Sequence, residues 1–241
     1  MPRLPSDRPF LASASGVLAV LLAVTLLGGC DQSPPEHAFL PWDTQVNEHG
    51  QVSVFGVTLG ESTLLDFKRL YDQKADLAIF AKAGEPMTLE AYFGQMHVGP
   101  LTAKVVLVAE ADEETLQRWA EQSQLANPTP SGARMLSMSD DAMVEAQEKP
   151  IRSISYVPTA DYSEELIRRQ FGEPSQRQMI ADPERGEDEA PAVLWLYPEK
   201  GLAITVEPNG KELFQYINPD EFDQLLASSI ANIEKHAPVA P

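Results

Sequence analysis

The chain has 241 residues, with 18 Lys and Arg against 36 Asp and Glu, and a formal net charge of −18 at pH 7. Its contents of 43% apolar and 22% charged residues are typical of a globular protein and exclude a disordered or fibrous one. The acidity argues against nucleic acid as a partner, because tracking phosphates needs a basic face, and against a polybasic grip on anionic lipid. Cysteine occurs once, so neither an internal disulfide nor a multi-thiolate metal site can form.

Residues 1–29 have the layout of a secretory signal peptide. Arg3 and Arg8 place positive charge near the start, and no residue from Pro9 to Gly29 is ionisable. The compact apolar run Val17–Leu27 is followed by two glycines and then by Cys30. This run of about 11 residues is shorter than the roughly 20 residues that span a bilayer.

The residues Leu27-Gly28-Gly29-Cys30 resemble the lipobox of bacterial lipoproteins. The resemblance covers about the first 31 residues. It implies that the Cys30 thiol receives a diacylglyceryl group, that the signal is cut before Cys30, and that the new amine is acylated. The acylated Cys30 would then anchor the chain in the lipid bilayer, since each buried methylene contributes about 0.8 kcal/mol and two or three acyl chains hold firmly. The mature chain keeps its acidity, because removing Arg3, Asp7 and Arg8 changes the net charge from −18 to −19.

An alternative at this N-terminus is an uncleaved anchor helix in which Cys30 is an ordinary small apolar residue. The charge-free stretch from Pro9 to Gly29 is 21 residues, which is just long enough to span. Both interpretations place the bulk of the protein outside the cytoplasm.

Asp31 follows the cysteine. An aspartate there resembles the signal that keeps enterobacterial lipoproteins in the inner membrane, and it favours the inner over the outer membrane. The alternative is that Asp31 is only a polar residue of the tether.

Residues 30–42 are expected to form a lipidated tether, because their prolines favour extended backbone. Residues 43–132 are expected to form a first α+β unit, which a Pro- and Gly-containing break ends at 127–132. Its expected elements are a hairpin over Thr44–Val46 and Gln51–Phe55, a helix capped by Ser62 or Thr63 and carrying Leu64, Phe67, Leu70 and Tyr71, strands Leu77–Ala81, Leu89–Phe93 and Leu101–Ala109, and a helix from Asp112 through Gln124.

Residues 133–160 are expected to be a bridge and residues 161–233 a second α+β unit, before a disordered tail over 234–241. The bridge is expected to hold a strand over Met135–Met138, a helix over Asp140–Gln147 capped by Ser139, and a strand over Ile151–Val157. The second unit is expected to hold a helix with an Asp161/Glu164 capping box that ends at Gly172, strands Gln176–Ile180, Val193–Tyr197, Leu202–Val206 and Glu212–Ile217, and a last helix opened by Asn218 or Asp220.

The order helix, antiparallel strands, helix therefore occurs twice. It predicts an α+β fold with antiparallel sheets, helices on one face, and two similar α/β units in tandem. Phe171-Gly172-Glu173-Pro174 and the Leu194–Val206 hairpin faintly resemble the small lipoprotein of the outer-membrane β-barrel assembly machinery and its relatives. This resemblance covers about 60 residues, and the doubled unit, the larger size and Asp31 depart from it. No functional residue is transferred from that family.

No motif indicates catalysis, a cofactor or a metal. The four histidines, His37, His49, His97 and His236, have no ligand spacing, and His97 beside Gly99-Pro100 is expected in a surface loop. No Gly-x-Ser-x-Gly elbow or phosphate-binding loop occurs. The acidic run 182–189 lacks the bidentate glutamate that an EF-hand needs at its twelfth position, where Val193 stands, and is expected to be a solvated loop.

Among the tryptophans, Trp119 and Trp195 are expected in the core, because each lies in an expected element with apolar neighbours. Trp42 is expected to pack on the domain, and contact with the membrane or a partner is its alternative. Together the residues predict a membrane-anchored periplasmic lipoprotein with a non-catalytic binding or adapter role toward an envelope protein. The alternative is an envelope hydrolase or small-ligand-binding protein with an N-terminal anchor.

Overall fold

The computed structural model describes residues 39–123, 125–129, 132–180, 190–224 and 226. Some of the predicted features lie outside these residues: the signal peptide 1–29, the lipidation site Cys30, the sorting residue Asp31, most of the tether, the acidic run 182–189, His37, His236 and the tail 234–241.

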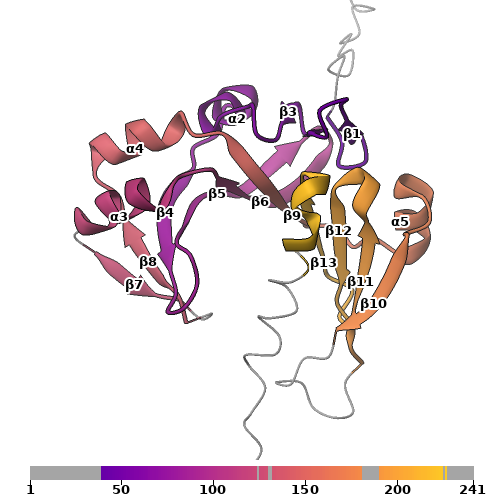
Figure 1. The fold of residues 1–241 in the computed structure, drawn as a ribbon. Coiled ribbons are helices and arrows are strands. Elements are labelled where there is room, and N and C mark those ends of the chain that lie inside the picture. Colours follow the sequence, from indigo (N-terminus) through magenta and orange to yellow (C-terminus); the bar gives the residue numbers. More distant parts are fainter. Residues whose placement is uncertain (1–38, 124, 130–131, 181–189, 225, 227–241) are drawn as a thin grey trace, which may run out of the picture. The chain divides into compact units, whose positions relative to one another are not determined.

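The described residues form an α+β fold with two antiparallel sheets, as predicted (Figure 1). The small sheet has the order β1-β2-β3 and consists of β1 (Gln45–Val46), β2 (Val52–Val54) and β3 (Val57–Thr58). The large sheet has ten strands in the order β10-β11-β12-β13-β9-β6-β5-β4-β8-β7. Its strands are β4 (Asp76–Ala81), β5 (Thr88–Val98), β6 (Leu101–Ala109), β7 (Ala126–Pro128), β8 (Arg134–Ser137), β9 (Ile151–Pro158), β10 (Gln176–Ile180), β11 (Ala192–Tyr197), β12 (Leu202–Val206) and β13 (Glu212–Ile217).

Four labelled α-helices accompany the sheets in the described part of the chain: α2 (Leu64–Tyr71), α3 (Glu113–Glu121), α4 (Asp140–Gln147) and α5 (Glu164–Phe171). Helical residues also begin at Phe222, where the last helix was expected. Each of the four labelled helices begins after a side chain that accepts a hydrogen bond from a backbone N–H of the first turn, namely Thr63, Asp112, Ser139 and Ser163. The predicted Asp161/Glu164 capping box is wrong, because the Ser163 hydroxyl directly before the helix accepts from the Leu166 N–H instead. Short 3₁₀ turns, η2 (Pro198–Lys200) and η3 (Pro219–Glu221), follow β11 and β13.

One face of the large sheet is covered by the four α-helices, which confirms the predicted layering. Leu107 of β6 and Tyr216 of β13 point to this face and belong to one buried cluster. Phe67 of α2, Trp119 of α3 and Phe171 of α5 belong to the same cluster. Trp195 lies there too and is fully buried, so the expectation that Trp119 and Trp195 are core residues is confirmed.

The expected bridge, residues 133–160, supplies the strand at the middle of the large sheet. β9 pairs with β6 on one side, where Ile154 opposes Leu107, and with β13 on the other, where Tyr156 opposes Phe214. The described residues of 43–132 and of 161–233 therefore contribute to one continuous sheet, and they lie in one compact unit. That they are two copies of one unit stays a prediction. The expected break at 127–132 partly fails, because β7 begins at Ala126 and pairs with β8.

The N-terminal hairpin packs on an aromatic cluster. Phe55 stacks on Tyr156 with ring centroids 5.3 Å apart, and Tyr216 donates a buried hydrogen bond of 2.8 Å to the Pro41 carbonyl. Trp42 meets Phe171 edge to face, at 6.5 Å between centroids. The expectation that Trp42 packs on the domain is therefore confirmed.

Glu212 is the one charged residue that is buried among the described residues, with 4% of its surface exposed. Its Oε1 accepts a hydrogen bond of 3.0 Å from the Tyr162 N–H. Burial raises the pKa of the Glu212 carboxyl above its ordinary value, and the nearby charge of Asp161 adds to the rise.

We therefore predict that Glu212→Gln becomes more stable relative to the parent as the pH rises. A carboxyl with a raised folded-state pKa stabilises the fold below its unfolded-state pKa, and this contribution is lost as the pH rises through the folded-state pKa. Glutamine stays neutral and keeps the acceptor for Tyr162. Urea unfolding of both proteins between about pH 4 and pH 7 measures the difference. Glu199→Gln, at an exposed position, is the control and should show no such trend.

Candidate functional site

The face of strands β4, β5, β6 and β9 that lies opposite the helices carries half-buried side chains. Across these strands Glu90 opposes Val108, which opposes Ser153, and Tyr92 opposes Val106. We call this surface the open face and define it by Phe80, Glu90, Tyr92, Val106, Val108 and Ser155. None of the six belongs to a buried cluster, and Tyr92 is 41% exposed.

The other half of the same sheet face is covered. Leu194, Leu196, Ala203 and Ile217 form a second buried cluster with Phe222, and Leu226 packs against it. The chain after β13 thus lies on the sheet face opposite the four α-helices, so the expectation that all helices share one face does not extend to this last turn. The open face therefore begins beside β13, where the residues after β13 no longer cover the sheet.

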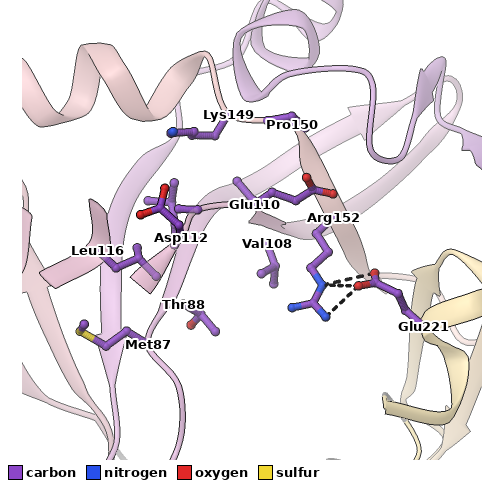
Figure 2. Close-up of a pocket in the computed structure, with 13 residues that line it drawn as sticks. Met87, Thr88, Val108, Glu110, Asp112, Leu116, Lys149, Pro150, Arg152 and Glu221 are labelled. Carbon is purple, nitrogen blue, oxygen red and sulfur yellow. Dashed lines mark hydrogen bonds and ion pairs between the residues drawn. The ribbon is translucent and has the colours of Figure 1, made fainter. Parts of the chain in front are cut away.

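A pocket of about 590 Å³ lies at one end of the open face (Figure 2). It is formed where β5 starts, β6 ends and β9 starts, because these antiparallel neighbours bring those termini to the same edge of the sheet. Its lining includes Thr88, Val108, Glu110, Asp112, Lys149 and Arg152.

Arg152 fastens the C-terminal turn to this end of the sheet. Its Nε donates to both carboxylate oxygens of Glu221, at 2.9 and 3.2 Å, and its Nη2 donates to Gln224 at 3.1 Å. Such a paired guanidinium is held in place and has little freedom to turn toward a ligand. Arg152 therefore serves first as a clamp between β9 and the segment that follows β13.

Asp112, on the opposite side of the pocket, is occupied by its role as a helix cap. Its Oδ1 accepts from the Thr115 N–H at 2.7 Å, and its Oδ2 accepts from the Thr115 hydroxyl at 2.9 Å. These hydrogen bonds from Thr115 lower the pKa of the Asp112 carboxyl. Two of the charged residues that line the pocket, Arg152 and Asp112, thus already have partners.

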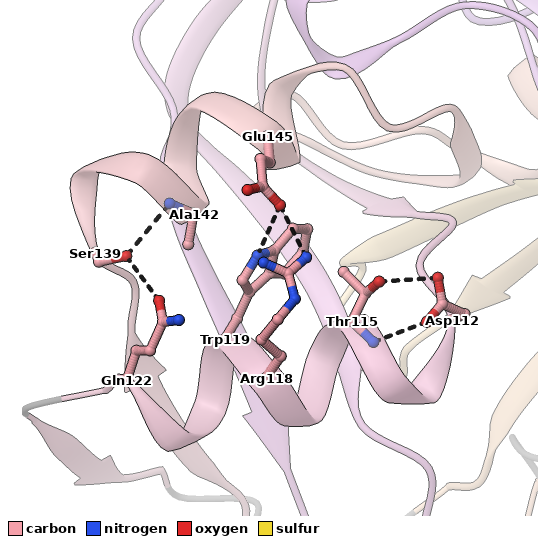
Figure 3. A network of polar contacts seen from close by, with 8 residues as sticks. All are labelled: Asp112, Thr115, Arg118, Trp119, Gln122, Ser139, Ala142 and Glu145. Atoms are coloured by element: carbon pink, nitrogen blue, oxygen red, sulfur yellow. Dashed lines mark hydrogen bonds and ion pairs between the residues drawn. The ribbon is translucent and has the colours of Figure 1, made fainter.

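A polar network on the covered side joins α3 to α4 (Figure 3). Arg118 and the Trp119 indole N–H both donate to Oε2 of Glu145, at 2.9 and 3.3 Å. Ser139, which caps α4, also donates to Gln122 at 3.3 Å. This network fixes α3 and α4 relative to each other, and its role is structural.

Glu90 is a half-buried acidic group within the open face, and the exposed Asp76 lies on the same side of the sheet, opposite Tyr92. Oε1 of Glu90 accepts a hydrogen bond of 2.9 Å from the Thr88 hydroxyl, and the cross-strand neighbours of Glu90 are Ala78 and Val108. Burial raises the pKa of the Glu90 carboxyl above its ordinary value, and the bond from Thr88 offsets part of the rise. In the part of the chain that the structure describes, no cationic side chain pairs with Glu90.

The structure brings together residues that the sequence did not single out. Glu90 stands in an alternating strand, where a polar residue on every second position is ordinary, so no sequence signal marked it. His97 is exposed as expected, but it lies within β5 rather than in a loop, and its Nδ1 is 3.3 Å from the Thr102 hydroxyl.

Over the described ranges, no three His, Cys, Asp or Glu side chains gather as a metal site would require. None of the helices in those ranges has the length and apolarity needed to cross a bilayer. No protein-family model, no curated protein and no solved structure matches this chain.

Proposed function

We propose that this protein is a bacterial lipoprotein, anchored by acylated Cys30, whose α+β domain faces the periplasm and binds an envelope protein. The anchor is supported by the apolar run before Leu27-Gly28-Gly29-Cys30. A net charge of −19 after cleavage gives no electrostatic grip on anionic lipid, so covalent acyl chains are the consistent means of attachment. Asp31 favours retention in the inner membrane.

The observation that carries the binding role is the open face. The half-buried Phe80, Val106 and Val108 and the exposed Tyr92 lie on one face of three adjacent strands, β4, β5 and β6, without described elements packed on them. Contiguous apolar surface of this kind marks interaction sites in soluble domains. The open face therefore supports the proposal of a protein-binding role.

We predict that Cys30→Ser moves the protein from the membrane to the soluble fraction and abolishes labelling by radioactive palmitate. The physical reason is that serine offers no thiol for the thioether that holds the diacylglyceryl group. Fractionation, labelling and mass spectrometry of the N-terminal peptide measure the change. Gln32→Ser, a neighbouring polar change, is the control and should leave all three unaltered.

A parent protein that keeps its first 29 residues and carries an unmodified Cys30 thiol would show that the anchor is a helix. If lipidation is found, density separation of the two membranes tests the sorting residue. Asp31→Ser is then expected to shift the protein toward the outer membrane.

The pocket favours a second candidate, a small-ligand-binding protein, because about 590 Å³ lies within the usual range of ligand pockets. A ligand held there would raise the melting temperature by mass action. If the ligand no longer raises the melting temperature of Lys149→Ala, while this variant still binds its protein partner, the ligand is assigned to the pocket.

A further inference from the structure

We propose that the open face recognises a lysine or arginine side chain presented within an apolar segment of the partner protein, and that Glu90 receives that cation. This proposal rests on the proposed binding role and names the chemistry of the partner. It concerns the protein surface and makes no use of the lipid anchor.

The Glu90 carboxylate is isolated from other charged side chains among the described residues. Glu90 lies among the apolar side chains of Val108, Ala78 and Tyr92, and among the described residues its side chain accepts a hydrogen bond from a neutral hydroxyl, that of Thr88. Burial disfavours its ionised form, as the raised pKa records. A cation brought by a partner would therefore stabilise a charge that the described residues leave uncompensated.

Two cations near the open face, Lys104 and Arg152, are placed away from Glu90. Lys104 lies on the open side of β6, four residues from Val108, which is about 13 Å along the strand. Arg152 is held by Glu221 and Gln224. Neither can neutralise Glu90 without leaving its present position.

The charge and the apolar residues of the open face favour one kind of partner over a second copy of the chain. A second copy of this chain would bring another surface with an unpaired carboxylate, and two mature molecules of net charge −19 repel each other. A partner segment with one cation among apolar residues complements both parts of the surface: the cation meets Glu90, and the apolar residues cover Val106 and Val108. Charge complementarity of this kind selects one partner over others.

The test uses the full-length lipidated protein in its own membrane. A photoreactive amino acid replaces Tyr92, which is exposed beside Glu90, and a second protein carries it at Met179, which is 74% exposed on the edge strand β10. A third protein carries it at Val106, which opposes Tyr92 on the open face. We expect a protein adduct from position 92 and none of the same mass from position 179. Mass spectrometry of the cross-linked peptide is expected to show a Lys or Arg within about four residues of the attached atom.

Affinity is then measured between the purified protein and a synthetic peptide of the cross-linked sequence. We expect Glu90→Gln to weaken binding about tenfold or more, since a charge-assisted hydrogen bond at a partly desolvated site is lost. Replacing the Lys or Arg of the peptide by Gln should weaken binding equally, and this change should add nothing in the Glu90→Gln protein. Glu199→Gln, which removes an exposed carboxylate in η2 and outside the open face, should change the affinity less than about twofold.

The outcomes separate the two proposals. An adduct whose affinity does not depend on Glu90 overturns this inference and leaves the binding role of the open face standing. An adduct to lipid or to a second copy of the chain also overturns it. If neither position 92 nor position 106 yields any adduct, the proposed function itself fails. Unchanged melting temperature of Glu90→Gln shows that a lost affinity does not come from unfolding.

Discussion

Gly201→Ala is expected to destabilise the fold by about 2 to 5 kcal/mol. Gly201 has φ +58°, and a Cβ there would lie 2.0 Å from the Ile217 carbonyl oxygen and 2.6 Å from a methyl of Val52. The Ile217 N–H also donates to the Gly201 carbonyl at 2.9 Å, so the two backbones cannot separate without losing this bond. Steric overlap with backbone therefore adds to the cost of the left-handed conformation.

Gly210→Ala is the matched control for this prediction. Gly210 has φ +78°, but nothing lies within 4 Å of the position that a Cβ would take there, so only the conformational cost of about 1 kcal/mol applies. Urea unfolding followed by circular dichroism compares the two variants. Equal losses of stability would contradict the close packing of η2 against the end of β13.

Trp119→Ala is expected to destabilise the fold by about 3 to 5 kcal/mol, because it empties a large space in the core. Trp119 is fully buried, and its indole N–H donates to Glu145. The side chain thus joins the core below α3 to the polar network that holds α4. Equilibrium unfolding by urea, followed by far-ultraviolet circular dichroism, measures the loss of stability.

Trp119→Phe separates the two contributions of this side chain. It keeps most of the apolar volume and removes the N–H donor, so a smaller loss than that of Trp119→Ala is expected. A loss below about 1 kcal/mol for Trp119→Ala would show that α3 is not packed on the sheet as described.

Individual elements of this fold followed from local patterns. The bounds of α4, Asp140–Gln147, and its cap Ser139 agree with the prediction, because a capping hydroxyl and helical spacing are contained in nine consecutive residues. Strands β12 and β13 were bounded correctly for a similar reason, since alternation and the turn at Gly210 are local signals. β5 was predicted too short, because the bulge between Phe93 and Gln95 interrupts the alternation before Val98.

The arrangement of these elements did not follow from such patterns. β9 was predicted as a strand of a bridge, but its place between β6 and β13 depends on pairing with residues far away in the chain. The cap of α5 was also predicted wrongly, at Asp161, whereas Ser163 directly before the helix accepts the hydrogen bond from Leu166.

The amino-acid sequence by itself determined the acidity, the α+β class and most of the helices and strands, since local patterns depend on residues close together in the chain. The export signal is a prediction of the same local kind. Only the tertiary structure decided that one half of a sheet face is covered by the C-terminal turn while the other half is open. It also placed Glu90 among apolar neighbours from β4 and β6. The physical reason is that burial of a side chain is set by the strands beside it, and strand order is settled by pairing across long separations, which no local pattern encodes.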